Sequence, residues 1–134
     1  VSTEYNHALS PALSHLLNHF GASLFAFKPS AIVTYSMGQW GGARAAVNMR
    51  SFLSELGCLP VSAMIHIPKA HEAIDSDGQF QAEQERWESY FGRTLAQLIW
   101  WADAANAHKA EQDPTRLSPA FHHTPSQRDA PSCQ

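Results

Sequence analysis

The sequence predicts an α/β domain built on parallel strands. Two short apolar segments, residues 30–35 and 61–67, have the length of strands, and the amphipathic segment between them has helical spacing. A strand, a helix and a second strand of one sheet joined by short connections form a right-handed crossover, so the two strands run parallel. The near-continuous apolar character of residues 30–35 also indicates a strand that is covered on both faces.

A first helix is expected ahead of these strands, over about residues 11–20. Ser10 is a suitable N-cap, Pro11 suits the first helical position, and Gly21 follows the apolar repeat. A second helix follows a glycine-rich loop, and Gly57 fits a left-handed C-terminal cap for it. Its apolar stripe consists of Ala46, Met49, Phe52, Leu53 and Leu56.

A third, long helix is predicted from Phe80 to about Lys109, after a turn signal at residues 75–78. This segment has no Pro and no internal stop other than Gly92. Its expected packing stripe consists of Trp87, Phe91, Leu95, Leu98 and Trp101.

Residues 1–110 are interpreted as one partial domain, whereas residues 111–134 are expected to be a disordered tail. The tail contains four prolines and few apolar side chains, which cannot offset the entropy lost on ordering. Two strands are too few for a stable open sheet, because their faces and edges stay poorly covered. Together with Val1 in place of an initial Met, this predicts that partners or missing sequence supply further strands.

Composition and charge exclude several classes of partner. Of the 134 residues, 44% are hydrophobic, and the formal net charge is −3 without any cluster of Lys or Arg. No nucleic acid and no membrane surface is therefore expected as a partner, and no segment resembles a membrane span or a signal peptide. Cys58 and Cys133 form neither a disulfide framework nor a metal spacing. These features predict a reducing, cytoplasmic setting.

The loop from Ser36 to Gly42 is the main candidate for a binding site. Three glycines within five residues let the backbone turn sharply and approach a ligand. The loop lies at the carboxyl end of a predicted parallel strand and opens a helix, whose first N–H groups and positive dipole end would face an electron-rich ligand. Because the spacing matches neither the dinucleotide fingerprint nor the phosphate loop, we expect a planar ring edge rather than a phosphate. Trp40 is expected to contact this ligand or a neighbouring subunit.

Two other interpretations of this loop stay open. It could be only a tight connection. Alternatively, Ser36 in a strand–Ser–x–Gly–helix segment resembles a hydrolase nucleophile elbow, with Asp75 and either His71 or His66 as partners. Thr34 stands where that elbow needs a small residue, which argues against a hydrolase.

The remaining histidines favour structural roles. His15 and His19 lie four residues apart on a predicted helix, but no third ligand is near them in sequence, so no metal site is expected. His66 lies on a strand that is otherwise apolar, which predicts a hydrogen-bonded or partly exposed histidine rather than a catalytic base.

Several segments, in this order, resemble the NADPH-dependent FMN reductase family, which also contains chromate and quinone reductases. The segments are Thr3-Glu4-Tyr5-Asn6-His7 with Ser10-Pro11-Ala12-Leu13, Lys28-Pro29, Ser36 to Gly42, Gly42-Ala43-Arg44-Ala45-Ala46 and Trp100-Trp101-Ala102. The resemblance covers about residues 2–109. It implies a flavodoxin-like, three-layer fold with five parallel strands, of which this chain would keep strands four and five whole. It also implies that the chain starts at the end of strand three, so that the family's phosphate loop lies outside it.

The same resemblance implies that two loops line the ring of FMN. The residues are Thr3, Glu4, Tyr5 and Asn6 from the first loop, and Ser36, Met37, Gly38, Gln39, Trp40, Gly41 and Gly42 from the second. No side chain is assigned as an acid or a base, because the flavin carries the chemistry. Thr3 stands where the family usually has Pro, and residues 14–19 also depart from the family pattern, which bears on acceptor preference and on the subunit interface.

The resemblance implies an FMN-containing oxidoreductase that takes hydride from NAD(P)H and reduces a quinone or a similar small-molecule acceptor. As a whole protein it would form a homodimer or a homotetramer. A second hypothesis is that the chain is an inactive, truncated fragment that can only associate with other subunits. The serine hydrolase that uses Ser36 is the third.

Overall fold

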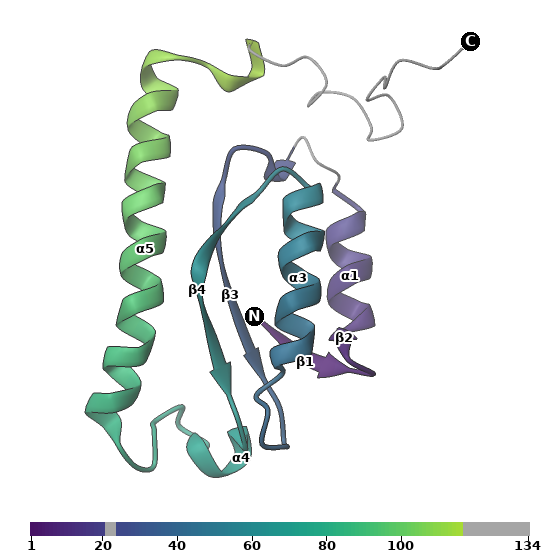
Figure 1. Cartoon of the computed structure of the whole chain (residues 1–134), viewed down its shortest axis with the longest axis vertical. Helices are drawn as coiled ribbons and strands as arrows, with labels where there is room; N and C mark the ends of the chain where they lie inside the picture. The colour runs from purple at the N-terminus through teal and green to yellow at the C-terminus, as the bar shows by residue number, and fades with distance from the viewer. Residues whose placement is uncertain (21–23, 117–134) are drawn as a thin grey trace.

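The computed structural model describes residues 1–20 and 24–116 and has three layers (Figure 1). A sheet lies between α5 on one side and α1 and α3 on the other, which is the arrangement of a flavodoxin-like α/β fold. The strands are β1 (Ser2–Tyr5), β2 (Ala8–Leu9), β3 (Pro29–Tyr35) and β4 (Leu59–Ile67). The helices are α1 (Pro11–Asn18), α3 (Ala43–Glu55), α4 (Ala70–Ala73) and α5 (Gln84–Glu111), and Pro114–Arg116 form a 3-10 turn.

The sheet has the strand order β2-β1-β3-β4. The predicted crossover is confirmed, because β3 and β4 pair in parallel along most of their length, from Pro29 opposite Leu59 to Tyr35 opposite Ile67. The residue patterns alone indicated only two strands, which is wrong. The family resemblance implied two whole strands preceded by the end of another, and β3, β4 and the short parallel β1 agree with this. The short β1 pairs in parallel with the end of β3 and antiparallel with β2, and segments of four and two residues are too short to show a hydrophobic period.

A two-residue turn joins β1 to β2. Asn6 and His7 both have positive φ, of 47° and 65°, as the central residues of a type I′ hairpin turn do. Asn tolerates this left-handed conformation better than most residues. The turn therefore fixes the end of β1 close to the start of α3, with which β1 and β2 are in contact.

The hydrophobic core lies between the sheet and the pair α1 and α3. Its buried members are Ile32, Ala46, Met49 and Leu53. Leu13 and Leu17 pack against this cluster from α1, whose N-terminus has the expected cap, since the Leu13 N–H donates to the Ser10 hydroxyl over 3.3 Å.

The boundaries of the long helix differ from the expected ones. α5 begins at Gln84 rather than at Phe80, because Phe80 bridges to Ile74 and stacks on Trp87 with ring centroids 4.9 Å apart. The expected packing stripe is also displaced, since Leu95 is 44% exposed whereas its neighbour Thr94 is fully buried.

The chain downstream of residue 110 is described only in part. α5 continues to Glu111, and the 3-10 turn Pro114–Arg116 follows it, while the rest of the predicted tail, residues 117–134, lies outside the described residues. Among the described helices, none has the length and apolar character that a membrane span requires.

The C-terminus of α3 has the predicted left-handed cap. Gly57 has φ 82°, its N–H donates to the Ser54 carbonyl over 3.0 Å, and the Cys58 N–H donates to the Leu53 carbonyl over 2.9 Å. These two bonds define a Schellman motif, which ends the helix and turns the chain into β4.

Side chains from two helices cover the backbone edge of β4, the last strand of the sheet. Tyr90 of α5 accepts a hydrogen bond from the His66 N–H over 3.0 Å and donates to the Met64 carbonyl over 3.3 Å. Gln97 accepts from the Ala63 N–H over 3.1 Å. From α3, the Arg50 guanidinium donates to the carbonyls of Pro60, Val61 and Ser62 over 3.3, 2.8 and 3.1 Å.

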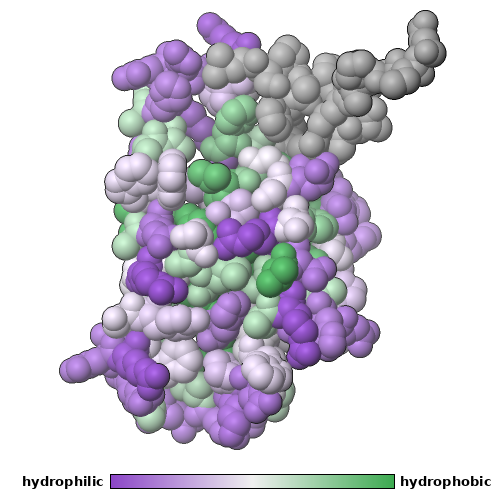
Figure 2. All heavy atoms as spheres, in the orientation of Figure 1, coloured by the Kyte–Doolittle hydropathy of each residue, from purple (hydrophilic) through white to green (hydrophobic). Residues whose placement is uncertain are grey.

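Edge strands expose unpaired backbone groups that invite pairing with other chains. On the face drawn in Figure 2, apolar residues are concentrated in the middle together with some strongly hydrophilic residues, and hydrophilic residues dominate the periphery. Because side chains of α3 and α5 hydrogen-bond to the backbone N–H and carbonyl groups of β4, these groups are not available to pair with a further strand.

The Arg50 contacts predict a measurable stability effect. Replacing Arg50 by Ala removes three hydrogen bonds from a charged donor to β4, and we expect the free energy of unfolding to fall by about 1–3 kcal/mol. Arg93→Ala, at an exposed position of α5, is the matched control and should change stability by less than about 0.5 kcal/mol. Urea unfolding measures both, and equal effects of the two variants would contradict the role given to Arg50.

Candidate flavin site

The two loops identified in the sequence meet at the carboxyl ends of β1 and β3. They enclose an open cavity of about 350 Å³. Its lining residues are Glu4, Asn6, His7, Ser36, Gly38, Trp40 and Arg44. Segments about 30 residues apart in sequence therefore form one site, at the end of the sheet where open α/β folds bind ligands.

Backbone hydrogen bonds fix the glycine loop to the turn that follows β4. The Ser36 N–H donates to the Ile67 carbonyl over 3.1 Å. In return, the N–H groups of Lys69 and Ala70 donate to the carbonyls of Gly38 and Ser36, each over 3.0 Å. The loop is thus held at three points by a neighbouring segment, which gives it a defined shape.

Two of the three loop glycines are required by their surroundings. Gly41 has φ 58°, and a Cβ atom there would lie 2.9 Å from the backbone nitrogens of Ile67 and Pro68. Gly42 has φ 76°, and a Cβ atom there would lie 2.9 Å from the Thr34 Cβ. Gly38 differs, since a Cβ atom there would meet nothing within 4 Å. The close packing of Gly41 and Gly42 on the ends of β4 and β3 sets the path of the loop into α3.

Glu4 occupies the N-terminus of α3. Its carboxylate accepts hydrogen bonds from the Arg44 N–H over 3.2 Å and the Ala45 N–H over 3.4 Å, and it forms an ion pair with the Arg44 Nε over 2.9 Å. The Glu4 side chain is only 11% exposed. The expectation that this helix terminus faces a ligand is therefore wrong, because a carboxylate of the chain itself already binds its N–H groups and offsets its dipole.

Several backbone N–H groups of the glycine loop have no hydrogen-bond acceptor in the described part of the chain. Within residues 1–20 and 24–116, no acceptor receives a hydrogen bond from the N–H groups of Met37 through Gly42. Trp40 lies in the same loop with 63% of its surface exposed. An exposed indole beside a row of free N–H groups can bind a flat, electron-rich ring by contact and by hydrogen bonds to its polar edge.

Not every predicted site residue lines this cavity. Thr3 lies in β1 opposite Tyr35, while Tyr5 and Met37 are exposed and are not among the residues that line the cavity. Gln39 is exposed as well, and Gly41 and Gly42 are buried beneath the loop. These residues border the site, whereas Glu4, Asn6, Ser36, Gly38 and Trp40 lie in it.

Sequence reasoning missed Arg44 and His7 as lining residues. Arg44 directly follows Gly42-Ala43 and carries the charge opposite to that of Glu4, but the two are 40 positions apart. Only the parallel pairing of β1 with β3 brings them together. His7 enters the lining because the turn after β1 is so tight.

The residues proposed for a hydrolase do not form a triad. The Ser36 hydroxyl donates to the Gly38 carbonyl over 3.0 Å. His66 Nδ1 bonds instead to the Thr34 hydroxyl over 2.9 Å, as expected for a structural histidine, and burial lowers its pKa. His71 lies beside Glu72, and the Asp75 carboxylate accepts from backbone N–H groups of its own turn. Within the described part of the chain, no three His, Cys, Asp or Glu side chains lie close enough together to hold a metal ion.

The loop glycines give a matched test of this geometry. Gly41→Ala adds a methyl group at positive φ and against two backbone nitrogens, so we expect it to lower the free energy of unfolding by more than about 1–2 kcal/mol. Gly38→Ala, at an ordinary φ and in open space, should be neutral or raise stability by about 0.4–1 kcal/mol. Thermal unfolding compares the two. A Gly41→Ala protein as stable as the Gly38→Ala protein would contradict the close approach described above.

Comparison with known proteins identifies one family. No curated protein sequence matches this chain. The family model described as NADPH-dependent FMN reductase matches residues 1–72, a span that contains both site loops, β3, α3 and β4. More than half of the 134 residues therefore match one family, and the chain belongs to the NADPH-dependent FMN reductase family.

Proposed function

We propose that this chain forms the ring-binding part of an FMN-containing oxidoreductase that uses NAD(P)H to reduce a quinone or a similar small acceptor. Membership of the family supports reductase chemistry with FMN and NADPH in general. One observation carries the proposal for these residues: among the loop residues whose N–H groups bind no acceptor within the described chain, Gly38 and exposed Trp40 line the cavity between the two loops.

The cavity fits the flavin ring better than the flavin phosphate. Its volume of about 350 Å³ is near the lower limit for small-molecule sites, about 300–1,000 Å³. The Glu4 carboxylate lies in its wall and already occupies the helix terminus that would otherwise attract a phosphate. A neutral ring with carbonyl oxygens at its edge avoids repulsion by Glu4 and can accept from the loop N–H groups.

Each part of the site has a role in this proposal. The loop N–H groups would bind the polar edge of the ring and stabilise negative charge that develops there. Trp40 would cover a face of the ring, and Arg44, held by Glu4 over 2.9 Å, would supply a fixed positive charge at the rim. FMN, when bound, supplies the hydride chemistry between NAD(P)H and the acceptor. The chain's contribution is to bind and orient the ring and to keep this charge in place.

Other features of the assembled protein belong to the same proposal. A cytoplasmic location and a homodimer or homotetramer fit it. The cysteine usage supports the location, and the family resemblance supports the oligomer. A chain that can only associate with other subunits is the competing account, and flavin binding separates the two.

Titration of the chain with riboflavin and with FMN tests the proposal. Because the described contacts involve the ring alone, we expect both flavins to bind weakly. The dissociation constants of riboflavin and FMN should agree within about threefold, which is a difference in binding free energy below about 1 kcal/mol. Trp40→Ala should weaken both by about two- to tenfold, the value of one aromatic contact. Flavin fluorescence measures the binding.

Trp100→Ala is the matched control for this titration. Trp100 is also 63% exposed but lies on α5, away from the cavity, so its loss should leave flavin binding unchanged. Equal effects of the two variants would refute the role of Trp40. FMN binding far tighter than riboflavin binding would refute a ring-only site, and no binding of either flavin would favour the account based on association alone.

A further inference from the structure

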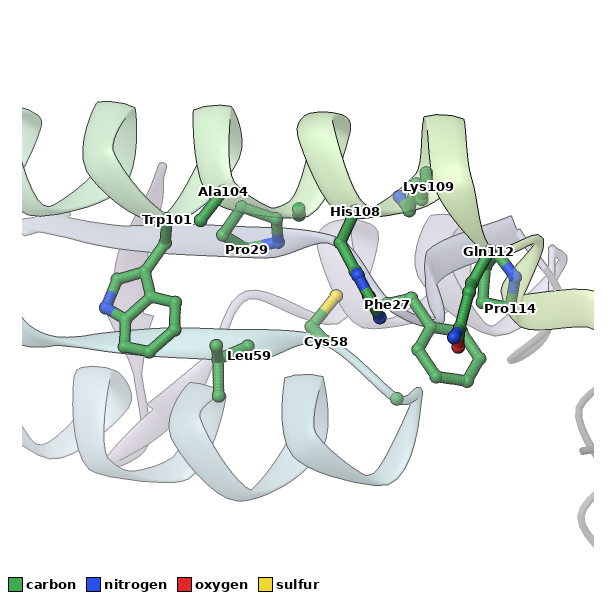
Figure 3. A pocket seen from close by; sticks show the side chains of 12 residues that line it. Phe27, Pro29, Cys58, Leu59, Trp101, Ala104, His108, Lys109, Gln112 and Pro114 are labelled. Carbon is green, nitrogen blue, oxygen red and sulfur yellow. The ribbon is translucent and has the colours of Figure 1, made fainter. Parts of the chain in front are cut away.

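A second cavity, of about 590 Å³, lies at the opposite end of the sheet from the glycine loop (Figure 3). It is enclosed by the C-terminal half of α5 and by the segments that lead into β3 and β4. Its apolar wall includes Phe27, Pro29, Leu59, Trp101 and Pro114. The volume and the largely apolar lining are typical of sites for small organic ligands.

The space arises from the pattern of side chains along α5. Trp101, Ala104, Ala105 and His108 recur at helical spacing and face the strands. The two alanines leave a gap between the larger side chains at either end. Figure 3 shows Trp101 and His108 pointing from the helix toward β4 and Cys58. The cavity is therefore long, with an indole near one end and an imidazole toward the other.

Positive charge gathers at the imidazole end. His108 and Lys109 both line the cavity. Burial raises the pKa of the Cys58 thiol, and the positive charge of Lys28 opposes that rise. Neither Lys28 nor Lys109 has an ion-pair partner within the described residues. The Asp113 carboxylate forms an ion pair with Arg116 over 3.8 Å and accepts hydrogen bonds from Thr115. An apolar cavity with unpaired cations at one end complements a molecule with an apolar body and an anionic head.

We propose that this cavity binds a single-chain amphiphilic carboxylate, with the hydrocarbon along Trp101, Ala104 and Ala105 and the carboxylate at Lys109 and His108. This site is distinct from the flavin site and does not depend on the function proposed for it. Cys58 lies in the wall of the cavity and serves as a reporter, because a bound chain would cover its thiol.

The test uses the 134-residue chain carrying Cys133→Ser, so that Cys58 is the only thiol. Decanoate is the probe, with octanoate, decanol and decyltrimethylammonium as controls, and alkylation of Cys58 by iodoacetamide is followed alongside tryptophan fluorescence. Decanoate should slow alkylation at least about fivefold at saturation and should bind about tenfold more tightly than octanoate, which has two fewer methylene groups. Decanol should bind less well than decanoate, and the cationic amphiphile should bind least.

Two variant pairs locate the ligand. Ala105→Leu fills the gap and should abolish the effect of decanoate on Trp fluorescence, whereas Ala110→Leu, outside the lining, should not. Lys109→Gln should remove the preference for decanoate over decanol, whereas Lys69→Gln, at the other end of the sheet, should keep it. The probe series is measured on the chain that carries Cys133→Ser alone and needs no cavity variant. It therefore tests the proposal even where a cavity variant fails to fold.

Three results would overturn the proposal. Fast alkylation that decanoate leaves unchanged would show that the cavity does not bind amphiphiles. Slow alkylation without ligand, unaffected by decanoate, would likewise show that decanoate does not cover the thiol, since burial alone raises the pKa of Cys58 and slows its reaction. If that slow rate rises on dilution, a second copy of the chain covers the thiol. Equal binding of decanoate and decyltrimethylammonium would show that Lys109 and His108 do not select the head group.

Discussion

The carboxylate of Glu4 joins the first strand of the sheet to the start of α3, and the arrangement of the site depends on this contact. It binds two N–H groups of the helix and the guanidinium of Arg44. Because Glu4 comes from β1 and Arg44 follows the glycine loop, one nearly buried side chain fixes the two loops relative to each other. It also determines which N–H groups a ligand can reach, those of the loop rather than those of the helix.

The backbone around this contact has little freedom. Gly41 and Gly42 touch the ends of the strands so closely that a methyl group has no room, and the loop is hydrogen-bonded to the segment after β4. The strand that leads into that segment, β4, is itself hydrogen-bonded along its edge by Arg50, Tyr90 and Gln97. A rigid frame of this kind suits a site that binds a flat ring by fixed backbone donors, because little order is lost on binding.

The sequence was sufficient to predict long, strongly patterned elements and the loop between them. The crossover of β3, α3 and β4, the Ser10 and Gly57 caps and the structural role of His66 all follow from local residue patterns. Strands β1 and β2 are too short to show a period, so the residue pattern did not predict them. β1 is defined by its pairing with β3, and β2 by its pairing with β1. The capping of α3 by Glu4 was missed for a similar reason, since it joins residues 40 positions apart. Local pattern likewise placed Leu95 in the packing stripe of α5, whereas the orientation of the helix on the sheet buries Thr94.

The central claim is that the loop N–H groups are open to a ligand while the first N–H groups of α3 are taken by Glu4. Amide chemical shifts of the isotope-labelled chain, followed during titration with riboflavin, test this claim directly and detect weak binding. We expect the largest shifts at the amides of Gly38 and Trp40 and at the Trp40 indole, with little change at Arg44 and Ala45. Shifts concentrated at Arg44 and Ala45, with the loop amides unmoved, would show that the ligand displaces Glu4 and would contradict the account.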